Sequence, residues 1–251
     1  MTGSAPSKLR LDEALVARGH YASRSRARDA VLRSAVSVNG TLAAKPSLGV
    51  GEADVISVSD AALAYVSRAA LKLIAGLDHF SLSVKDLRAL DIGSSTGGFS
   101  QVLLERGAAH VTGVEVGHGQ LHPSLSQDAR LTNIEGLNAR DLTRDHLGGD
   151  AIAFVTSDVS FISLTLALPP ALALADAGAH CLLLVKPQFE AGREAIGKGG
   201  LLKDPAEGER VAEALKAWLD AQPGWRATGL CPSPIDGGDG NREFLLAGVK
   251  D

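Results

Sequence analysis

Two lysines and two carboxylates stand where side chains of an α/β protein can do chemistry. Asp158 directly follows the apolar run "AFVTS", Lys186 follows "CLLLV", and Glu243 directly precedes "FLLAGV". Lys72 lies between two leucines of the helical stretch "SRAALKLIAGL". An amine held beside carboxylates can take the proton of a weak nucleophile or stabilise the anion that the nucleophile becomes. These four residues, called the tetrad below, are therefore candidate catalytic residues.

The elements around the tetrad predict a doubly wound parallel sheet. Short runs rich in Val, Ile and Leu alternate with helical or loop stretches, which is typical of that architecture. After a long amphipathic helix at 205–221, two final runs are joined by a Gly-rich turn with no room for a helix, so they should pair antiparallel. The expected parallel strands lie at 87–93, 110–116, 130–136, 151–158 and 180–187, and the antiparallel pair lies at 225–234 and 242–249.

This topology predicts that the tetrad converges. If the strand at 242–249 runs against the parallel strands, it begins at the sheet edge where they end. Asp158, Lys186 and Glu243 then meet at that edge, where ligands of such sheets bind. The helix that carries Lys72 needs only to pack across it. Because unpaired charges at strand ends are costly, a purely structural network of salt bridges is an alternative explanation for the four residues.

The stretch "LDIGSSTGGFSQVLLERG" predicts a ligand-binding turn between a strand and a helix. Its glycines give G-x-x-x-G-G where the dinucleotide fingerprint is G-x-G-x-x-G, which favours a ligand smaller than a dinucleotide. Glu115 can accept hydrogen bonds from both hydroxyls of a ribose, Asp91 can meet a cationic amino group directly or through water, and Asn138 can read an adenine edge. Ribose, adenine and an amino-acid moiety without a pyrophosphate describe S-adenosylmethionine. The predicted cofactor contacts are Asp91, Gly93, Ser94, Ser95, Thr96, Gly97, Gly98, Glu115, Asn138 and Asp158.

The N-terminal segment predicts a small module that grips a polyanion. Between Lys8 and Lys45 there are eight Lys and Arg against three acids, in a chain of net charge −4. The motifs "RLDEAL", "SRSRA" and "VSVNG" predict two short helices and a hairpin, and they resemble the RNA-binding domain of small-subunit ribosomal protein four. A merely solvated basic helix face is the alternative. The predicted RNA contacts are Arg10, Arg18, Arg24, Arg26, Arg28 and Arg33, with Arg193 and Lys198 of the Gly-rich stretch "EAGREAIGKGG", expected to be a mobile flap or a plain flexible loop.

Composition excludes several classes of protein. The longest apolar run, at 161–175, is broken by two prolines and is shorter than the roughly 20 residues that span a bilayer. No apolar signal segment begins the chain, so we expect a cytoplasmic protein. The two cysteines have no CxxC spacing, and no HExxH pattern or neighbouring carboxylate completes a site with His118 and His122. No metal site is therefore expected.

Longer motifs resemble those of the TlyA family of ribosomal RNA ribose 2′-O-methyltransferases, whose catalytic domain is FtsJ-like. They are "SRAALKL", "LDIGSSTGGFSQVLLERGA", "SDVSFISL", "LLLVKPQFEAGREAIGKGG" and "GNREFLL", and the resemblance runs from about Lys8 to Val249. It implies a Rossmann-like methyltransferase domain at 60–251 behind an RNA-binding domain at 1–59, with S-adenosylmethionine as methyl donor. It also implies a cytidine ribose in ribosomal RNA as acceptor, ribosomal RNA or ribosomal subunits as partners, and a catalytic Lys-Asp-Lys-Glu set that falls on the tetrad.

Two features depart from the family pattern. Glu115 stands where aspartate is common, which should preserve ribose binding, and little sequence precedes the RNA-binding domain. Members of the family differ in whether they modify both ribosomal subunits or only the large one. The short form favours the large subunit alone.

The residues leave the role of Lys186 and some functions open. Lys186 could act as a base, if partial burial and Lys72 favour its neutral form, or it could stay charged and steer an alkoxide. A membrane-lytic hemolysin, a name the family has carried, would need an amphipathic or spanning segment. An RNA-binding assembly factor would not need an intact tetrad. A base methyltransferase would need an aromatic slot for a flipped base, and no aromatic cluster is evident near the motifs.

Overall fold

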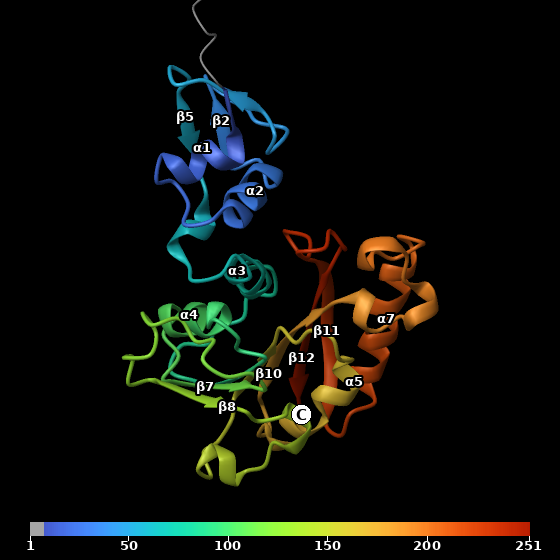
Figure 1. Ribbon diagram of the computed structural model, residues 1–251. Coiled ribbons are helices and arrows are strands. Elements are labelled where there is room, and N and C mark those ends of the chain that lie inside the picture. Colours follow the sequence, from blue (N-terminus) through green and yellow to red (C-terminus); the bar gives the residue numbers. More distant parts are fainter. Residues whose placement is uncertain (1–7) are drawn as a thin grey trace, which may run out of the picture. The chain divides into compact units, whose positions relative to one another are not determined.

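The computed structural model describes residues 8–251, which form two compact units (Figure 1). The first unit ends at Leu63 and the second begins at Ala64. The boundary that we placed between residues 59 and 60 lies slightly earlier, and residues 1–7 of the expected first domain are outside the described part of the chain.

The first unit has its own apolar core beneath two helices and small antiparallel sheets. Ser23, one of the two serines expected to begin the second helix, accepts a hydrogen bond from the backbone N–H of Arg26 at 3.4 Å. Asn39 and Gly40 have φ values of 52° and 79°, which are typical of the predicted two-residue hairpin turn. The elements are β1 (Leu9–Arg10), α1 (Leu11–Ala17), α2 (Arg24–Leu32), β2 (Val36–Val38), β3 (Thr41–Leu42), β4 (Gly49–Val50), β5 (Ile56–Val58) and the 3-10 helix η1 (Ala61–Ala64).

The second unit is built on one seven-stranded sheet of order β11-β12-β10-β9-β6-β7-β8. Five neighbouring strands are parallel, and β12 pairs antiparallel with both β10 and β11, which confirms the predicted antiparallel pair. The strands are β6 (Arg88–Ile92), β7 (His110–Glu115), β8 (Leu131–Glu135), β9 (Phe154–Ser157), β10 (His180–Val185), β11 (Trp225–Pro232) and β12 (Phe244–Lys250). The α-helices are α3 (Ala70–His79), α4 (Gly98–Glu105), α5 (Leu164–Ala167), α6 (Pro169–Leu174) and α7 (Glu207–Asp220); the 3-10 helices are η2 (Ala139–Asp141), η3 (Asp145–Leu147), η4 (Pro187–Phe189), η5 (Arg193–Ala195) and η6 (Lys198–Gly200).

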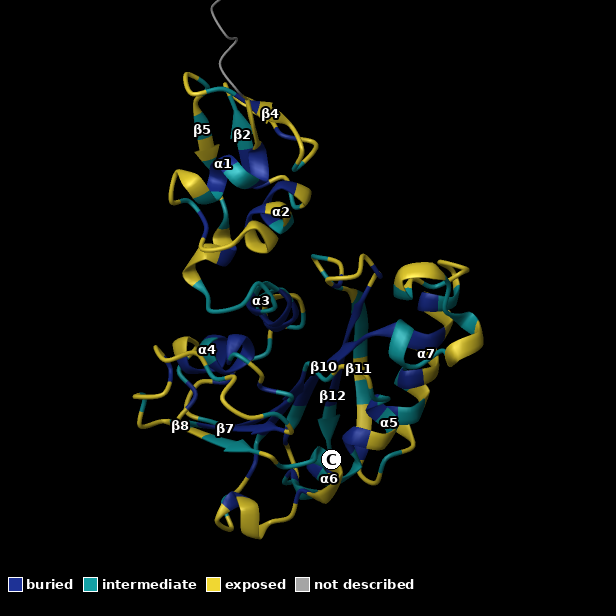
Figure 2. Ribbon diagram, viewed as in Figure 1, coloured by how far each residue is buried: buried dark blue, intermediate teal, exposed yellow. Residues whose placement is uncertain are grey.

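Helices cover both faces of this sheet, so the second unit has three layers. In Figure 1, α3 and α4 lie on one side of the strands, and α5 and α7 lie on the other. Leu73 of α3 and Leu103 of α4 belong to the core on the first face, and Leu172 of α6 and Leu215 of α7 belong to the core on the second. The central strands β6, β7, β9, β10 and β12 are mostly buried, whereas the edge strands β8 and β11 are largely intermediate or exposed (Figure 2).

The start of α3 differs from the sequence prediction. We expected Ser67 to cap this helix, but α3 begins at Ala70 and its N-cap position is Ala69, which makes no side-chain cap. The hydroxyl of Ser67 instead accepts from the backbone N–H of Ala69 at 3.2 Å, two residues along the chain. Ser67 also packs closely on the next helix, because a Cβ at Gly98 would lie 2.8 Å from the Cβ of Ser67. The serine therefore fixes the approach of the chain to α3.

Candidate active site

The register of the sheet brings the tetrad together. Val185 of β10 pairs with Phe244 of β12, so Lys186 and Glu243 are the next residues on adjacent antiparallel strands. Leu183 of β10 also pairs with Ser157 of β9, which places Asp158 at the same edge. The structure therefore brings together the three residues whose meeting depended on an antiparallel β12.

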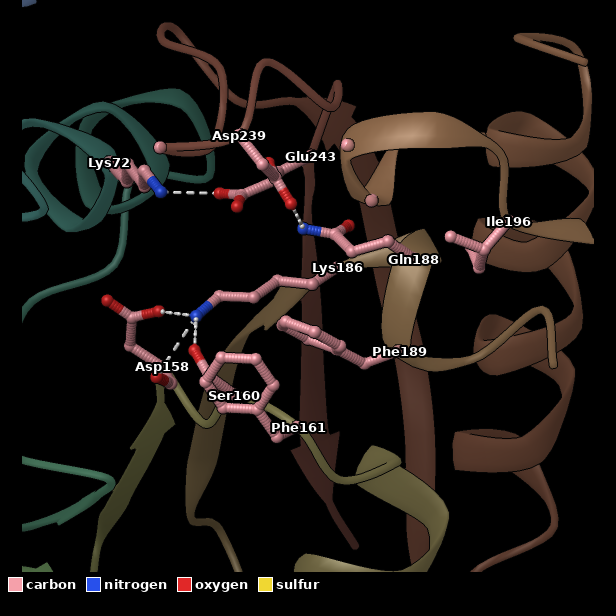
Figure 3. A pocket seen from close by; sticks show the side chains of 13 residues that line it. Lys72, Asp158, Ser160, Phe161, Lys186, Gln188, Phe189, Ile196, Asp239 and Glu243 are labelled. Atoms are coloured by element: carbon pink, nitrogen blue, oxygen red, sulfur yellow. Dashed lines mark hydrogen bonds and ion pairs between the residues drawn. The ribbon is translucent and has the colours of Figure 1, made fainter. Parts of the chain in front are cut away.

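Lys72 completes the group from α3. Ala70, Leu73 and Leu77 anchor this helix in the core, and Lys72 is itself only 5% exposed. Its Nζ donates a hydrogen bond to Oε2 of Glu243, which is 2% exposed (Figure 3). Burial raises the pKa of Glu243, and the adjacent Lys72 ammonium opposes that rise.

Lys186 makes the second ion pair of the tetrad. Its Nζ lies 2.6 Å from Oδ1 of Asp158 and donates to the carbonyl oxygen of the same residue at 3.3 Å. It also donates to Oγ of Ser160 at 2.7 Å (Figure 3). Sequence reasoning missed Ser160, because a serine in a loop carries no spacing signal.

A cavity of about 470 Å³, called the tetrad cavity, opens beside these residues. The Gly-rich segment that we expected to be a flap lines one side of it through Ile196, Gly199 and Gly200. Buried Asn241 holds this segment, since it donates to the Gly200 carbonyl at 2.8 Å and accepts from the Leu202 N–H at 3.0 Å. The other lining residues are Lys72, Asp158, Ser160, Phe161, Lys186, Gln188, Phe189, Gly238, Asp239 and Glu243 (Figure 3).

The turn after β6 takes a conformation that requires glycine. Gly93 and Gly97 have φ values of 83° and 91°, in the left-handed region, and Gly97 directly precedes α4. A Cβ at Gly93 would lie 3.1 Å from Cγ1 of Val159 and 3.2 Å from its backbone. The chain after β6 therefore passes close to the chain after β9, at the sheet edge that carries the tetrad.

Glu115 ties this turn to the end of β7. One carboxylate oxygen accepts from the Ser95 N–H at 3.0 Å, and the other accepts from the Gly117 N–H at 2.8 Å. The side chain is buried yet lines a second cavity of about 530 Å³, called the turn cavity. Each carboxylate oxygen keeps a further lone pair for a ligand hydroxyl.

The turn cavity contains half of the predicted cofactor contacts. Asn138 lines it, although its side-chain oxygen caps η2 by accepting from the Arg140 N–H at 3.1 Å. The predicted residues on its wall are Gly93, Ser95, Glu115, Asn138 and Asp158. The residues that shape the turn without lining the cavity are Asp91, Ser94, Thr96, Gly97 and Gly98. Lining residues that we did not predict are Ile92, Val114, Val116, Gln120, Leu137, Ala139, Val159, Ser160, Phe161, Ile162, Ala167 and Lys186.

Asp91 lies deeper than expected. It is fully buried beneath the turn, where Oδ2 accepts from the Ser100 hydroxyl at 2.7 Å and Oδ1 has no hydrogen-bond partner among the described residues. Burial, aided by the charge of Asp158, raises the pKa of Asp91 to about 7. The orphaned oxygen fits the amino group that we expected Asp91 to meet, through water or after a small movement of the turn.

Replacing Asp91 by asparagine is expected to flatten the pH dependence of folding. A carboxyl whose folded pKa is raised stabilises fully below its unfolded pKa, near 3.8, and this stability is lost as the pH rises through about 7. Between pH 5 and pH 8, the free energy of unfolding of wild type should therefore fall by roughly 2–3 kcal/mol relative to that of Asp91→Asn. Urea unfolding of the ligand-free proteins measures the difference, with exposed Asp145→Asn as control. Parallel pH profiles would contradict the raised pKa.

The two cavities share one wall, formed by Asp158, Ser160, Phe161 and Lys186. A ligand that gives up a chemical group in the turn cavity and a ligand that receives it in the tetrad cavity would meet across these side chains. The arrangement fits transfer of a small group between two ligands, with Lys186 beside the acceptor.

Known protein families match the two units of the chain separately. Residues 65–250 match the model of the FtsJ-like methyltransferase family, and residues 9–56 match the S4 domain. The 16S/23S rRNA (cytidine-2′-O)-methyltransferase TlyA of Mycobacterium tuberculosis is 41% identical over 240 residues, which are 95% of this chain and 89% of that protein. The chain belongs to the TlyA family of FtsJ-like methyltransferases.

Other proteins similar to this chain have different names. The 23S rRNA (cytidine-2′-O)-methyltransferase TlyA of Campylobacter jejuni is 38% identical over 195 residues, covering 74% of this chain and 72% of that protein. A solved structure from Streptococcus thermophilus, labelled a candidate hemolysin, is 39% identical with a TM-score of 0.74, covering 98% of this chain and 90% of that one. Within residues 8–251 of this protein, no helix is long and apolar enough to cross a membrane.

An aromatic pair in this TlyA-family site corrects one expectation. We found no aromatic cluster near the motifs, but the rings of Phe161 and Phe189 lie 4.9 Å apart at the tetrad cavity. The residues are far apart in sequence, and the crossover from β9 to β10 brings them together. The shortage of aromatic residues is therefore no argument against a flipped base. Among residues 8–251, no three His, Cys, Asp or Glu side chains are grouped as a metal site.

The arginines predicted to bind RNA differ in how strongly the fold engages them. Arg33 is engaged in the fold, because its guanidinium donates hydrogen bonds to the two carboxylate oxygens of Asp60 at 2.9 and 3.0 Å. Only 14% of its side chain is exposed. Arg18 likewise donates to the carbonyls of Asp54 and Gly51. These contacts compete with RNA phosphates for the two guanidinium groups, and RNA binding by Arg18 and Arg33 stays a prediction. Arg10 and Arg24 are exposed but also engaged, because Arg10 pairs with Asp12 and Arg24 pairs with both Asp12 and Glu13. Arg26 and Arg28 of the first unit and Arg193 and Lys198 of the second are exposed as well.

Proposed function

We infer that this protein transfers a methyl group from S-adenosylmethionine to the 2′-hydroxyl of a cytidine ribose in ribosomal RNA. The observation that carries the proposal is the wall of Asp158, Ser160, Phe161 and Lys186 between the turn cavity and the tetrad cavity. Relatives that match most of the chain are named for that reaction. The acceptor chemistry fits the tetrad, because a ribose hydroxyl is a poor nucleophile that needs a group to manage its proton.

The turn cavity is the proposed cofactor site. Glu115 would accept hydrogen bonds from the ribose hydroxyls, the remaining amide donor of Asn138 would face the adenine, and Asp91 would balance the amino group from below. Bound S-adenosylmethionine supplies an electrophilic methyl group, so that one methyl–oxygen bond forms, the sulfur keeps the electrons of the broken bond and the hydroxyl loses a proton. Lys186, which lines both cavities, is the proposed group that manages that proton.

Lys186 would act on the acceptor hydroxyl in one of two ways. As a neutral amine it takes the proton directly, and as an ammonium it stabilises the developing alkoxide. Asp158 fixes its Nζ at 2.6 Å in either case. Lys72 and Glu243, paired on the other side of the cavity, would orient the ribose and keep the local charge balanced. Holding the reacting groups in line contributes much of the rate in both modes.

The first unit is the proposed rRNA-gripping module, as its match to the S4 domain suggests. Neutralising Arg24, Arg26 and Arg28 together to glutamine should weaken binding to ribosomal subunits and flatten its salt dependence. Each phosphate that the variant no longer neutralises should lower the slope of log K against log salt by about 0.7–0.9. Cofactor affinity should not change, and turnover should recover at saturating rRNA because the tetrad lies in the other unit.

Subunit binding at several salt concentrations, beside steady-state methyl transfer, tests this role. The matched control neutralises three exposed basic residues of the second unit, Lys85, Arg106 and Arg226, and so changes the net charge equally. If both triple variants keep the wild-type slope and affinity, the basic face of the first unit is merely solvated.

The reaction itself is tested with purified small and large subunits that lack the modification. Radiolabelled S-adenosylmethionine and mapping of ribose methylation report whether a methyl reaches a 2′-oxygen, and on which subunit. Calorimetry with the cofactor alone checks the turn cavity independently. Subunit binding without transfer would favour an assembly factor, a labelled base would favour a base methyltransferase, and leakage of liposomes would favour a lytic protein.

A further inference from the structure

Three oxygen atoms of the protein surround the amine of Lys186. A lysine ammonium has three N–H donors, and three acceptors lie around this Nζ: Oδ1 of Asp158 at 2.6 Å, the Asp158 carbonyl at 3.3 Å and Oγ of Ser160 at 2.7 Å. The Asp158 carbonyl and Ser160 accept hydrogen bonds from Nζ, whereas Oδ1 of Asp158 is an ion-pair partner without hydrogen-bond geometry. A ribose hydroxyl that approaches Nζ competes with these oxygens, so one contact is exchanged when Lys186 acts on the ribose.

Ser160 is the partner best suited to that exchange. A carboxylate and a carbonyl only accept hydrogen bonds, whereas a hydroxyl can both accept and donate by rotating about its C–O bond. Ser160 is also exposed and lines both cavities, so its Oγ lies at the wall between donor and acceptor.

The loop that carries Ser160 is anchored on both sides. The Asp158 N–H donates to the Ile92 carbonyl at 3.1 Å, and half-buried Glu190 accepts from the Ser163 hydroxyl and from the Leu164 N–H at 2.7 Å. Between these anchors Phe161 has a φ of 64°, which a bulky residue adopts only where its surroundings hold it. The position of Ser160 is thus built into the loop.

We propose that Ser160 is a positioning residue for Lys186 in the methyl-transfer reaction. Its hydroxyl accepts an N–H of Lys186 and so holds Nζ at the wall between the two cavities, and it turns its own hydrogen toward the ribose oxygen when the ribose hydroxyl arrives. The ribose proton goes to Nζ if Lys186 is the base, and to solvent if Lys186 steers the alkoxide. Ser160 gains and loses no proton in either case; only its O–H bond reorients. This inference rests on the proposed function.

The test compares Ser160→Ala with Ser160→Thr in the full-length protein. Hydrogen bonds to charged groups are strong enough that loss of this one should lower kcat by about 10- to 100-fold. KM for the ribosomal subunit and the calorimetric affinity for S-adenosylmethionine should stay within about twofold, because Ser160 acts on neither ligand alone. Threonine keeps the hydroxyl and should restore kcat to within about threefold of wild type. Ser83→Ala, at an exposed serine of the second unit, is the matched control.

Three outcomes overturn the proposal. A Ser160→Ala enzyme with kcat within twofold of wild type would show that Lys186 needs no third partner. Equal losses in the alanine and threonine variants would assign the effect to loop packing, and a fall in cofactor affinity equal to the fall in kcat would assign it to the turn cavity. Failure of the wild-type protein to methylate ribose would instead contradict the proposed function.

Discussion

Replacing Lys186 by methionine is expected to slow methyl transfer by about 1000-fold while the protein stays folded. The substitution keeps the apolar stem that lies along the sheet edge and removes the amine beside Asp158 and Ser160. Proton management by a positioned side chain typically contributes 10²- to 10⁴-fold, so the expected loss lies in the middle of that range. Single-turnover transfer to the ribosomal subunit that accepts the methyl group measures the chemical step directly.

Cofactor binding separates this role from a structural one. Calorimetric affinity for S-adenosylmethionine should change by no more than a few-fold in Lys186→Met, because the charged side chain that would hold the cofactor ribose is Glu115. Lys85→Met, at an exposed position before β6, controls for the loss of one lysine. Gross unfolding of Lys186→Met, or loss of cofactor binding, would support the alternative in which the tetrad is only a network of salt bridges.

Replacing Lys72 by methionine is expected to destabilise the protein by about 3–5 kcal/mol near pH 8. Its partner Glu243 is nearly completely buried, and an uncompensated carboxylate in such a place costs about that much. Burial raises the pKa of Glu243 in the folded protein. The loss of stability in Lys72→Met should therefore shrink as the pH falls, because the carboxyl takes up a proton. Urea unfolding at pH 8 and pH 5 measures both effects.

The double variant Lys72→Met/Glu243→Gln tests what the pair is for. Removing both charges should recover most of the lost stability, since buried ion pairs can often be replaced by neutral groups. Methyl transfer should nevertheless remain at least about 100-fold below wild type if the pair orients the acceptor. A double variant that is both stable and active would mean that the pair only balances charge.

The convergence of Asp158, Lys186 and Glu243 could be predicted because it depends on strand topology alone, whereas Lys72 arrives through the packing of α3. Strand ends in a parallel sheet share an edge, and the short Gly-rich link between β11 and β12 left no room for a crossover helix. The pairing of Val185 with Phe244 then sets Lys186 beside Glu243. Such reasoning needs only the order and direction of strands, which apolar runs reveal.

Features that depend on side-chain orientation were not predictable in this way. The depth of Asp91, the engagement of Arg33 with Asp60 and the hydrogen bond between Ser160 and Lys186 follow from rotamers and loop paths. A sequence pattern reports which residue types are present but not which of their atoms meet. For the same reason the S4-like arginines could be recognised as a basic group but not divided into those that bind the fold and those that face solvent.

The place of β12 in the sheet has a consequence for how the site is assembled during synthesis. This strand lies between β10 and β11 although it follows both in sequence, so a nascent chain holds a gap in the sheet until residues 244–250 emerge. Until then the buried amine of Lys72 has no carboxylate, and β10 presents an open edge to other chains. Closing the gap both seals that edge and delivers Glu243, so a growing chain gains the carboxylate partner of Lys72 in the same step that protects it from aggregation.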